Sequence, residues 1–256
     1  MNILITGANE GIGYYMVTEL LGQGNNVTVL DLEIRELLKL KEKYPDEIFP
    51  IECDVRDTGG IRESVKECVD KYGSIDIAVH NACRCTFTSM IETEYSIYED
   101  VFNVNYFGAL RLAKCVIPYM EKVSSGKIIF TSSGVGVMGF HNISPYASSK
   151  GAIESLAKCL RIEYAEKGIT FQIFHPPLTK TKSASPLPVP QDFMADPKVV
   201  GTGLARRINK NNYYICHSFT QQLQTKLCYL FPIKMGKMMS MLLKRNGLQG
   251  TTGPIN

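Results

Sequence analysis

Short runs of β-branched and other apolar residues alternate with amphipathic stretches along most of the chain. The apolar runs predict buried strands at residues 3–6, 26–31, 48–53, 75–79, 127–131 and 170–174. Helical periodicity predicts helices at residues 12–23, 33–44, 58–72, 95–122 and 146–167, with a further helix at 198–209. This alternation predicts right-handed crossovers, and therefore an α/β fold with a doubly wound parallel sheet in three α/β/α layers. Because no repeat or linker interrupts it, residues 1–256 are expected to form a single domain.

Two segments depart from this alternation. Residues 176–200 carry six prolines, which sustain neither a helix nor an inner strand: Pro176, Pro177, Pro186, Pro188, Pro190 and Pro197. A loop of this length in a compact domain is typical of a lid or a substrate-binding loop. Residues 218–246 form an amphipathic C-terminal segment that is rich in Leu, Met and Lys and is interrupted by Pro232.

The composition adds limits on partners and location. Of the 256 residues, 45% are hydrophobic and 21% are charged, which is typical of a soluble globular protein. The net charge of +3 gives no basic field of the kind that attracts nucleic acid, so no nucleic-acid partner is expected. The first strand follows Met1 without the charged and apolar regions of a secretory signal, and the eight cysteines show no paired framework. We therefore expect reduced thiols and a cytoplasmic protein.

His80, Cys83 and Cys85 lie close together, and histidine and cysteine at short spacing can bind zinc. Such a site would need a second group of ligands at suitable spacing elsewhere in the chain, which the sequence does not offer. The pattern therefore favours packing roles for both thiols, and no metal site is expected.

The first strand ends in a glycine-rich turn that leads at once into a helix: Thr6-Gly7-Ala8-Asn9-Glu10-Gly11-Ile12-Gly13. Glycine permits the tight turn and the close approach of a pyrophosphate, while the helix N-terminus offers free N–H groups and a positive dipole end. An ordinary turn between a strand and a helix is the alternative interpretation. Its position in the first strand–helix unit favours a Rossmann-type dinucleotide site. The candidate contacts are Gly7, Asn9, Glu10, Gly11 and Gly13.

Asp31 ends the second predicted strand, where the adenosine ribose of a bound dinucleotide should lie. Its carboxylate can accept hydrogen bonds from both ribose hydroxyls and would repel a 2′-phosphate. Leu32 and Glu33 follow it rather than Arg or Lys, and Glu10 adds another negative charge. The sequence therefore predicts NAD in preference to NADP. Asp31 is also a candidate N-cap for the next helix, and both roles can coexist.

Tyr146 and Lys150 begin the helix at 146–167 and lie on one face of it, four residues apart. The pKa of a free tyrosine is about 10, and a nearby ammonium, joined by a positive nicotinamide ring, would lower it. Taken alone, such a pair usually marks only a solvated helix face. Ser133, just after the fifth strand, supplies a hydroxyl that could hold a substrate oxygen. Two polar residues complete the group: Asn105 inside the helix at 95–122, and Asn81 after the fourth strand.

Together these features resemble the short-chain dehydrogenase/reductase family, from residue 2 to about residue 210. The segments that carry the resemblance are TGANEGIG at 6–13, CDV at 53–55, HNA at 80–82, the second Asn of NVN at 105, Ser133, YASSK at 146–150 and PPLTKT at 176–181. The resemblance implies an oxidoreductase that acts on CH–OH groups with a nicotinamide cofactor.

The same resemblance implies a catalytic tetrad of Asn105, Ser133, Tyr146 and Lys150. Tyr146 would be the acid and base, and Ser133 would orient the carbonyl or alcohol. Lys150 would bind the nicotinamide ribose and lower the pKa of the tyrosine, while Asn105 would hold a water relay to Lys150.

The cofactor contacts implied by the resemblance extend along the whole cleft. They are Ile12 in the phosphate loop, Asp54 and Val55 at the adenine, Asn81 and Ala82 on the ribose side, Pro176 and Thr181 near the carboxamide, and Tyr146 and Lys150. Two positions depart from the family pattern, because Pro177 and Cys83 stand where glycine is usual. Pro177 puts the contacts of the loop in doubt, but the tetrad is intact.

The C-terminal part lacks the short glycine-ended strand with which many members of the family close the sheet. Its order resembles the branch of hydroxysteroid, retinol and 3-ketosphinganine oxidoreductases, which implies a lipophilic secondary alcohol or ketone. The nearly apolar residues 134–140, between Ser133 and Tyr146, suit such a substrate, although they could equally belong to the core.

Residues 226–245 form a basic amphipathic segment that is consistent with peripheral contact with a membrane surface. The alternative, slightly favoured, is that its apolar face packs on the domain or on a second subunit. The family resemblance implies a homodimer or homotetramer that associates through the helices at 95–122 and 146–167. A non-catalytic NAD(H)-sensing regulatory protein of the same fold is the alternative function; the presence of both Tyr146 and Lys150 argues against it.

Overall fold

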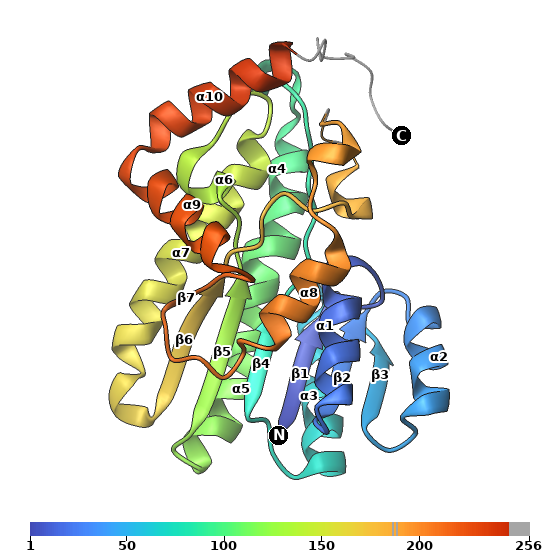
Figure 1. The fold of residues 1–256 in the computed structure, drawn as a ribbon. Helices are drawn as coiled ribbons and strands as arrows, with labels where there is room; N and C mark the ends of the chain where they lie inside the picture. The colour runs from blue at the N-terminus through green and yellow to red at the C-terminus, as the bar shows by residue number, and fades with distance from the viewer. Residues whose placement is uncertain (186, 188, 246–256) are drawn as a thin grey trace.

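A seven-stranded parallel sheet runs through the middle of the computed structural model, which describes residues 1–185, 187 and 189–245 (Figure 1). The strands are β1 (Asn2–Thr6), β2 (Asn26–Asp31), β3 (Ile48–Glu52), β4 (Ile77–His80), β5 (Gly126–Thr131), β6 (Ile169–Phe174) and β7 (Tyr214–Ile215). Their order is β3-β2-β1-β4-β5-β6-β7, and every neighbouring pair is parallel. The order reverses between β1 and β4, and ligands bind beyond the carboxyl ends of strands at such a point. This arrangement confirms the predicted fold class.

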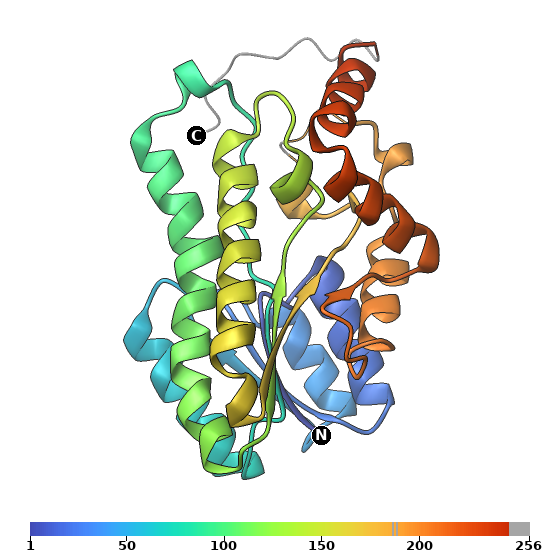
Figure 2. The same cartoon turned by 90° about the vertical axis from the view of Figure 1, so that its left-hand side faces the viewer.

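Helices cover both faces of the sheet (Figure 2). One face carries α1 (Gly11–Gly22), α2 (Arg35–Lys43) and α8 (Pro197–Ala205). The other carries α3 (Thr58–Tyr72), α4 (Tyr95–Phe102), α5 (Gly108–Lys122) and α7 (Ser144–Glu163). Because both faces are covered, consecutive strand residues such as Ile3, Leu4 and Ile5 are at most 1% exposed. Two apolar cores, one on each face, hold the sheet in place.

The long helix predicted at 95–122 contains a π-helical turn. The turn covers Asn103–Phe107 and joins α4 to α5 without ending the helix. A π-turn contains one residue more than an α-helical turn. Because the residues on both sides of it keep the apolar spacing of an α-helix, the periodicity does not reveal this insertion. Single π-turns inside α-helices are frequent at functional sites.

The end of the sheet differs from expectation. No strand was expected after residue 210, but Tyr214 and Ile215 form β7 and pair with Ile173 and Phe174 of β6. A strand of two residues has too short a pattern to be recognised in the sequence. The opposite edge is formed by β3, which contains Pro50.

The C-terminal segment forms two helices, α9 (Phe219–Leu230) and α10 (Pro232–Arg245), separated at Phe231. Both pack against α6 (Val135–Met138), a short helix beyond the carboxyl end of β5 (Figure 1). Gly236 of α10 lies so close to this segment that a Cβ there would be 2.4 Å from Gly139 O. Residue 246, predicted as the end of the segment, lies outside the described residues.

Helix α9 turns polar side chains toward the protein interior and apolar side chains toward the solvent. Its buried side chains are Gln221, Thr225 and Cys228. Its exposed side chains are apolar: Phe219, Leu223, Leu227 and Leu230. On α10, Ile233, Met238, Met241 and Leu242 are exposed as well. The alternative that the apolar face packs on the domain is therefore wrong for most of these side chains, whereas packing on a second subunit stays a prediction.

The proline-rich loop crosses the same end of the sheet before α8 begins. It contains 3-10 turns at Lys182–Ala184 and Gln191–Phe193, and a single bridge joins Thr179 to Ala195. Pro186 and Pro188 lie outside the described residues. In the part of the chain that the structure describes, no helix combines the length and apolar character needed to cross a bilayer.

Candidate active site

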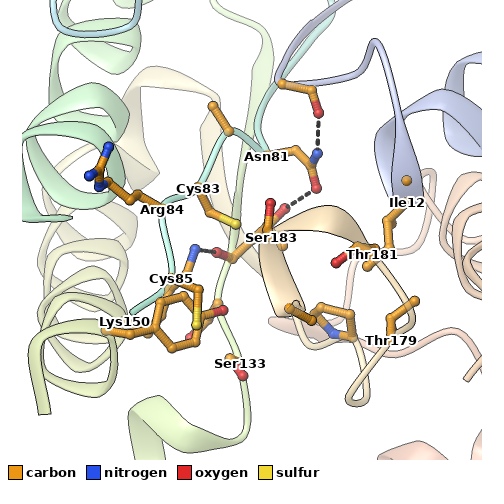
Figure 3. A pocket seen from close by; sticks show the side chains of 18 of the residues that line it. Ile12, Asn81, Cys83, Arg84, Cys85, Ser133, Lys150, Thr179, Thr181 and Ser183 are labelled. Atoms are coloured by element: carbon orange, nitrogen blue, oxygen red, sulfur yellow. Dashed lines mark hydrogen bonds between the residues drawn. The ribbon is translucent and has the colours of Figure 1, made fainter. Parts of the chain in front are cut away.

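One cleft of about 500 Å³ follows the carboxyl ends of the central strands (Figure 3). The glycine loop and the ends of β2 and β3 line one part of it, and the beginning of α7 lines the other. The proline-rich loop contributes Pro176 to Thr179, Thr181 to Ala184, Leu187 and Val189. The C-terminal helices contribute Gln221, Gln224, Thr225, Cys228 and Met239, none of which was predicted as a site residue.

The glycine loop is shaped by two close backbone approaches. Gly7 has a φ of +67°, and a Cβ there would be 2.4 Å from Ala82 Cα. A Cβ on Gly13 would be 2.5 Å from Gly7 O, so a side chain fits at neither position. Gly7, Asn9, Glu10, Gly11 and Ile12 line the cleft, whereas Gly13 supports the turn from behind. The loop thus presents the N-terminus of α1 to the cleft.

A buried network holds the loop against the end of β4. Asn81 Nδ2 donates to Gly7 O at 2.6 Å, and Thr6 Oγ1 accepts from the N–H groups of Asn81 and Ala82 at 3.2 Å. His80 Nδ1 lies 3.0 Å from Thr6 Oγ1, and His80 Nε2 lies 3.2 Å from Val104 O. Complete burial lowers the pKa of His80 to about 3, so the ring is neutral at physiological pH. Since Val104 O can only accept, Nε2 carries the proton and Nδ1 accepts from Thr6.

Asp31 and Asn9 connect the glycine loop to α2. Asp31 Oδ2 accepts from Asn9 N–H at 2.8 Å, and its Oδ1 accepts from Glu33 N–H at 3.3 Å. The N–H groups of Glu36 and Leu37, in the first turn of α2, donate to Asn9 Oδ1 at 2.9 and 3.4 Å. Asn9 therefore caps α2, and the alternative role of Asp31 as its N-cap is wrong. The Asp31 carboxylate lines the cleft and has lone pairs free for further donors.

Asp54 and Val55 also line the cleft, but the Asp54 carboxylate is bound to Arg56 at 2.7 Å. Arg56 also contacts Asp100 at 3.3 Å. The hydrogen bond from Arg56 is the main reason that the pKa of Asp54 lies below its ordinary value.

Thr181, which was predicted near the carboxamide of the cofactor, lies against Gly11, since a Cβ on this glycine would be 3.1 Å from Thr181 Cγ2.

Tyr146, Lys150 and Ser133 meet at the far end of the cleft. Lys150 Nζ lies 5.6 Å from the centroid of the Tyr146 ring and donates to Thr131 O at 2.7 Å. Lys150 is 1% exposed, and its hydrogen bond to Thr131 O fixes the position of the ammonium at this end of the cleft. Thr131 O, the acceptor, was not among the predicted site residues, because a backbone carbonyl leaves no sign in the sequence.

The chain's own groups move the pKa of Tyr146 upward, opposite to the expected direction. Burial is the main cause and the neighbouring Cys83 and Cys85 add to it, while a hydrogen bond from Ser133 acts in the other direction. Burial likewise lowers the pKa of Lys150. A net lowering of the tyrosine pKa therefore needs a further positive charge in the cleft, in addition to the ammonium of Lys150.

Asn105 lies in the π-turn and is fully buried. Its Oδ1 accepts from Arg84 N–H at 2.7 Å, and its Nδ2 donates to Arg84 O at 3.0 Å and to Ser149 Oγ at 2.9 Å. These bonds fix the segment after β4 against α7. Asn105 is close to the group formed by Tyr146 and Lys150, but the atoms it binds directly belong to Arg84 and Ser149 rather than to Lys150.

Cys83 and Cys85 follow β4 and point toward the same end of the cleft as Lys150 (Figure 3). Burial raises the pKa of the Cys85 thiol to about 12. All eight cysteines are free thiols. Among the described residues, no three His, Cys, Asp or Glu side chains are placed to hold a metal ion together.

The residues of the cleft fit a nicotinamide dinucleotide. A glycine cradle that excludes any Cβ faces a helix N-terminus, the combination that accommodates a pyrophosphate. From there the cleft continues past Asp31 and Asn81 to Lys150, Tyr146 and Thr181. The candidate cofactor residues are thus brought into one continuous site, except for Gly13 behind the loop.

Known proteins resemble this chain in sequence. Residues 1–191 match the family described as short chain dehydrogenase. A 3-oxoacyl acyl-carrier-protein reductase of Thermotoga maritima is 33% identical over 190 residues, 72% of this chain and 76% of that protein. Two Mus musculus proteins also match: dehydrogenase/reductase SDR family member 7 is 29% identical over 184 residues, and 3-ketodihydrosphingosine reductase is 30% identical over 192 residues. They align with 69% and 70% of this chain, which spans 54% and 57% of their own length.

Solved structures share the fold. A short-chain dehydrogenase from Streptomyces avermitilis superposes with a TM-score of 0.79 at 22% identity, covering 96% of this chain and 98% of that one. The structure of ElxO with NADP bound has a TM-score of 0.74 at 26% identity, covering 84% of this chain and 94% of that one.

Proposed function

Since the chain belongs to the short-chain dehydrogenase family and is an oxidoreductase that binds a nicotinamide cofactor, we propose that it interconverts a lipophilic secondary alcohol and its ketone. The observation that carries this proposal is the burial of Lys150 beside Tyr146 at the end of a cleft that begins in a glycine cradle. Burying an ammonium has a large desolvation cost, which indicates a functional role for it. At this position Lys150 can bind a cofactor in the cleft and influence the pKa of the Tyr146 phenol.

The lining of the cleft beside Tyr146 supports a lipophilic substrate. The side chains there are mostly apolar: Val135, Met138, Phe140, Leu178, Leu187, Val189 and Met239. The amides of Gln221 and Gln224 and the hydroxyl of Thr225 supply a few polar groups, as is usual in sites for apolar ligands. One relative is named 3-ketodihydrosphingosine reductase, which agrees with a keto-lipid or a molecule of similar character.

Four side chains perform the proton chemistry in this proposal. The cofactor supplies or accepts the hydride when bound. Tyr146 gives a proton to the carbonyl oxygen during reduction and recovers it during oxidation, and Ser133 donates a hydrogen bond to the same oxygen. Lys150 holds the nicotinamide ribose and favours the phenolate form of Tyr146, while Asn105 holds a water relay to Lys150.

The acidic corner of the cleft supports NAD over NADP. Glu10, Asp31 and Glu33 all line this corner, where they would repel a 2′-phosphate. Arg56 lines it too, but Asp54 and Asp100 already bind its guanidinium. A phosphate would have to compete with both carboxylates for this cation.

The proposal predicts turnover of apolar ketones with NADH. In a panel of steroid, retinoid, keto-lipid and small ketones, we expect NADH oxidation, followed by its absorbance, with the bulky apolar members. The kcat/KM with NADH is expected to exceed that with NADPH by about tenfold or more, because one unfavourable charge contact of about 1.4 kcal/mol changes a rate constant tenfold.

Two results of this assay would contradict parts of the proposal. A clear preference for NADPH would rule out the cofactor assignment and leave the reaction standing. Tight NADH binding without turnover of any ketone in the panel would favour the alternative, a protein that senses NAD(H) without catalysis.

The C-terminal helices support peripheral contact with an anionic membrane. After Asp196 the chain has no acidic residue and nine basic ones. The lysines at 226, 234 and 237 are exposed among apolar side chains, of which Leu230 is 69% and Ile233 is 66% exposed. An exposed apolar face bordered by lysines is the pattern of a helix that lies in a membrane interface.

We expect binding to vesicles that contain phosphatidylserine, and little binding to pure phosphatidylcholine, in co-sedimentation at low salt. Lys234→Gln with Lys237→Gln should weaken binding roughly thirtyfold, because each lysine contributes about 1 kcal/mol near an anionic surface. The matched control, Lys39→Gln with Lys66→Gln on α2 and α3, should bind as the unaltered protein does. Failure to bind anionic vesicles at low salt would rule out the membrane contact.

Two further assignments are part of the proposal. Residues 176–200 act as the substrate loop, since this segment lines the cleft up to Val189. The chain associates as a homodimer or homotetramer through the helices at 95–122 and 146–167, which expose Phe107 and Ile162.

A further inference from the structure

A buried carboxylate lies one helical turn beyond Lys150 and has no part in the proton chemistry above. It belongs to Glu154, which is 5% exposed. Tyr229 of α9 donates its hydroxyl to Glu154 Oε2 at 2.7 Å, and His175 Nε2 lies 2.9 Å from Oε1. His175 Nε2 is also 3.1 Å from the Tyr229 hydroxyl, so the three side chains form a closed group.

This group stands where four elements meet. Glu154 comes from α7 and Tyr229 from α9, while His175 follows β6 directly and donates its N–H to Ile215 O of β7 at 2.9 Å. Tyr214 of β7 completes the packing, with ring centroids 5.0 Å from Tyr229 and 5.4 Å from His175. The carboxylate therefore joins the catalytic helix to the C-terminal helix across the end of the sheet.

Glu154 is ionised at physiological pH. Burial acts to raise its pKa, but the nearby His175 and the hydrogen bond from Tyr229 outweigh burial and keep the pKa below its ordinary value. A hydrogen bond from a phenol to a buried carboxylate is about twice as strong as a neutral one. Burial keeps Tyr229 protonated by raising its pKa, so this donor is retained.

Few hydrogen bonds connect α9 to the rest of the described structure. Apart from those of Tyr229, they reach only α6 and residues 216 and 218, as between Cys228 and Met138 at 3.7 Å. The outer face of the helix is exposed and apolar. Tyr229 thus supplies the direct hydrogen bonds from α9 to α7 and to the end of β6.

We propose that Glu154 and Tyr229 form a positioning pair that sets the distance between α9 and the catalytic helix, and with it the width of the substrate end of the cleft. Neither side chain need touch the substrate. The side chains that face the cleft from α9 are Gln221, Gln224, Thr225 and Cys228, and they move with the helix. This proposal rests on the proposed function only in taking this end of the cleft as the substrate site.

The first test measures hydrogen exchange of the full-length chain by mass spectrometry. Tyr229→Phe, which removes one hydroxyl and keeps the ring, should accelerate amide exchange in residues 219–230 by about ten- to hundredfold, since the lost bond is charge-assisted. Tyr213→Phe is the matched control. Its hydroxyl donates to Glu154 O at 3.3 Å rather than to the carboxylate, so exchange in α9 should change by less than about twofold.

Glu154→Gln is the second variant, because it keeps the size of the side chain and removes its charge. It should accelerate exchange in α9 in the same direction by about three- to tenfold, since a neutral acceptor gives a bond of about half the strength. With an apolar ketone that the unaltered protein reduces, Tyr229→Phe should raise KM by about tenfold and change kcat by less than about threefold. NADH affinity, measured by fluorescence, should stay the same.

Unchanged exchange in α9 in Tyr229→Phe would overturn the proposal. Equal acceleration in α9 and in the sheet would also overturn it, because that result describes general destabilisation rather than release of one helix. If the unaltered protein fails to bind NADH or to reduce any ketone, the proposed function fails, while the exchange results still decide whether the pair positions α9.

Discussion

Tyr146→Phe is expected to lower kcat/KM for ketone reduction by about a thousandfold, because a positioned general acid contributes 10²–10⁴-fold to a rate. The substitution removes the only atom of this ring that can exchange a proton with the substrate oxygen. The ring is half-buried beside Lys150 and the thiols of Cys83 and Cys85, so phenylalanine fills the same space. NADH affinity should be retained, which a fluorescence titration of the same preparation checks.

Tyr98→Phe is the matched control for this experiment. Tyr98 lies on α4 outside the cleft, and its hydroxyl is 2.6 Å from Ser144 Oγ at the beginning of α7. The variant loses a hydrogen bond next to the catalytic helix and should keep activity within about threefold, since a neutral hydrogen bond contributes about 1 kcal/mol or less. If Tyr146→Phe kept more than a tenth of the activity, Tyr146 could not be the acid.

Asn105→Ala should lower the free energy of unfolding by about 3 kcal/mol and the melting temperature by roughly 6–12 °C. The buried amide makes three hydrogen bonds, two to the backbone of Arg84 and one to Ser149 Oγ. Alanine leaves these partners buried without a replacement, and the π-turn loses the side chain that ties it to the segment after β4. Urea unfolding gives the free energy, and thermal unfolding gives the temperature.

Asn103→Ala, in the same turn, separates this effect from a general sensitivity of the helix. Asn103 is only half-buried and accepts one side-chain bond, from Arg111 Nη2 at 2.7 Å, so its loss should cost about 1 kcal/mol. Equal stability losses in the two variants would contradict the special role of Asn105. Loss of activity in Asn105→Ala without loss of stability would instead place its main contribution in proton relay to Lys150.

The sequence predicted the sheet and most helices well because burial on both faces leaves a simple pattern. The helix at 58–72 was predicted to the residue. Its ends coincide with local signals: Asp57 accepts from Gly59 N–H at the start, and Gly73 ends it with a φ of +82°. The π-turn at Asn105 was not predicted, since one inserted residue leaves the apolar spacing around it almost unchanged.

The parts of the site that the sequence missed depend on contacts between distant residues. Asn9 caps α2 from the glycine loop, Thr131 supplies a backbone carbonyl to Lys150, and Glu154 meets Tyr229 on α9. None of these pairs has a fixed spacing, so no motif marks them. The inverted pattern of α9 misled for a related reason, because apolar periodicity does not say whether the apolar face is turned toward the protein or away from it.

The brevity of β7 has a consequence for how copies of this chain can meet. A parallel sheet has two outer edges, and a long exposed edge invites strand addition by a second chain and, in time, aggregation. Here one edge is a strand of two residues, and the other contains Pro50, which has no N–H to donate. Neither edge is a good template for an incoming strand. Among the described residues, we therefore expect the helical faces and the exposed end formed by α9 and α10 to be the surfaces through which this molecule meets others.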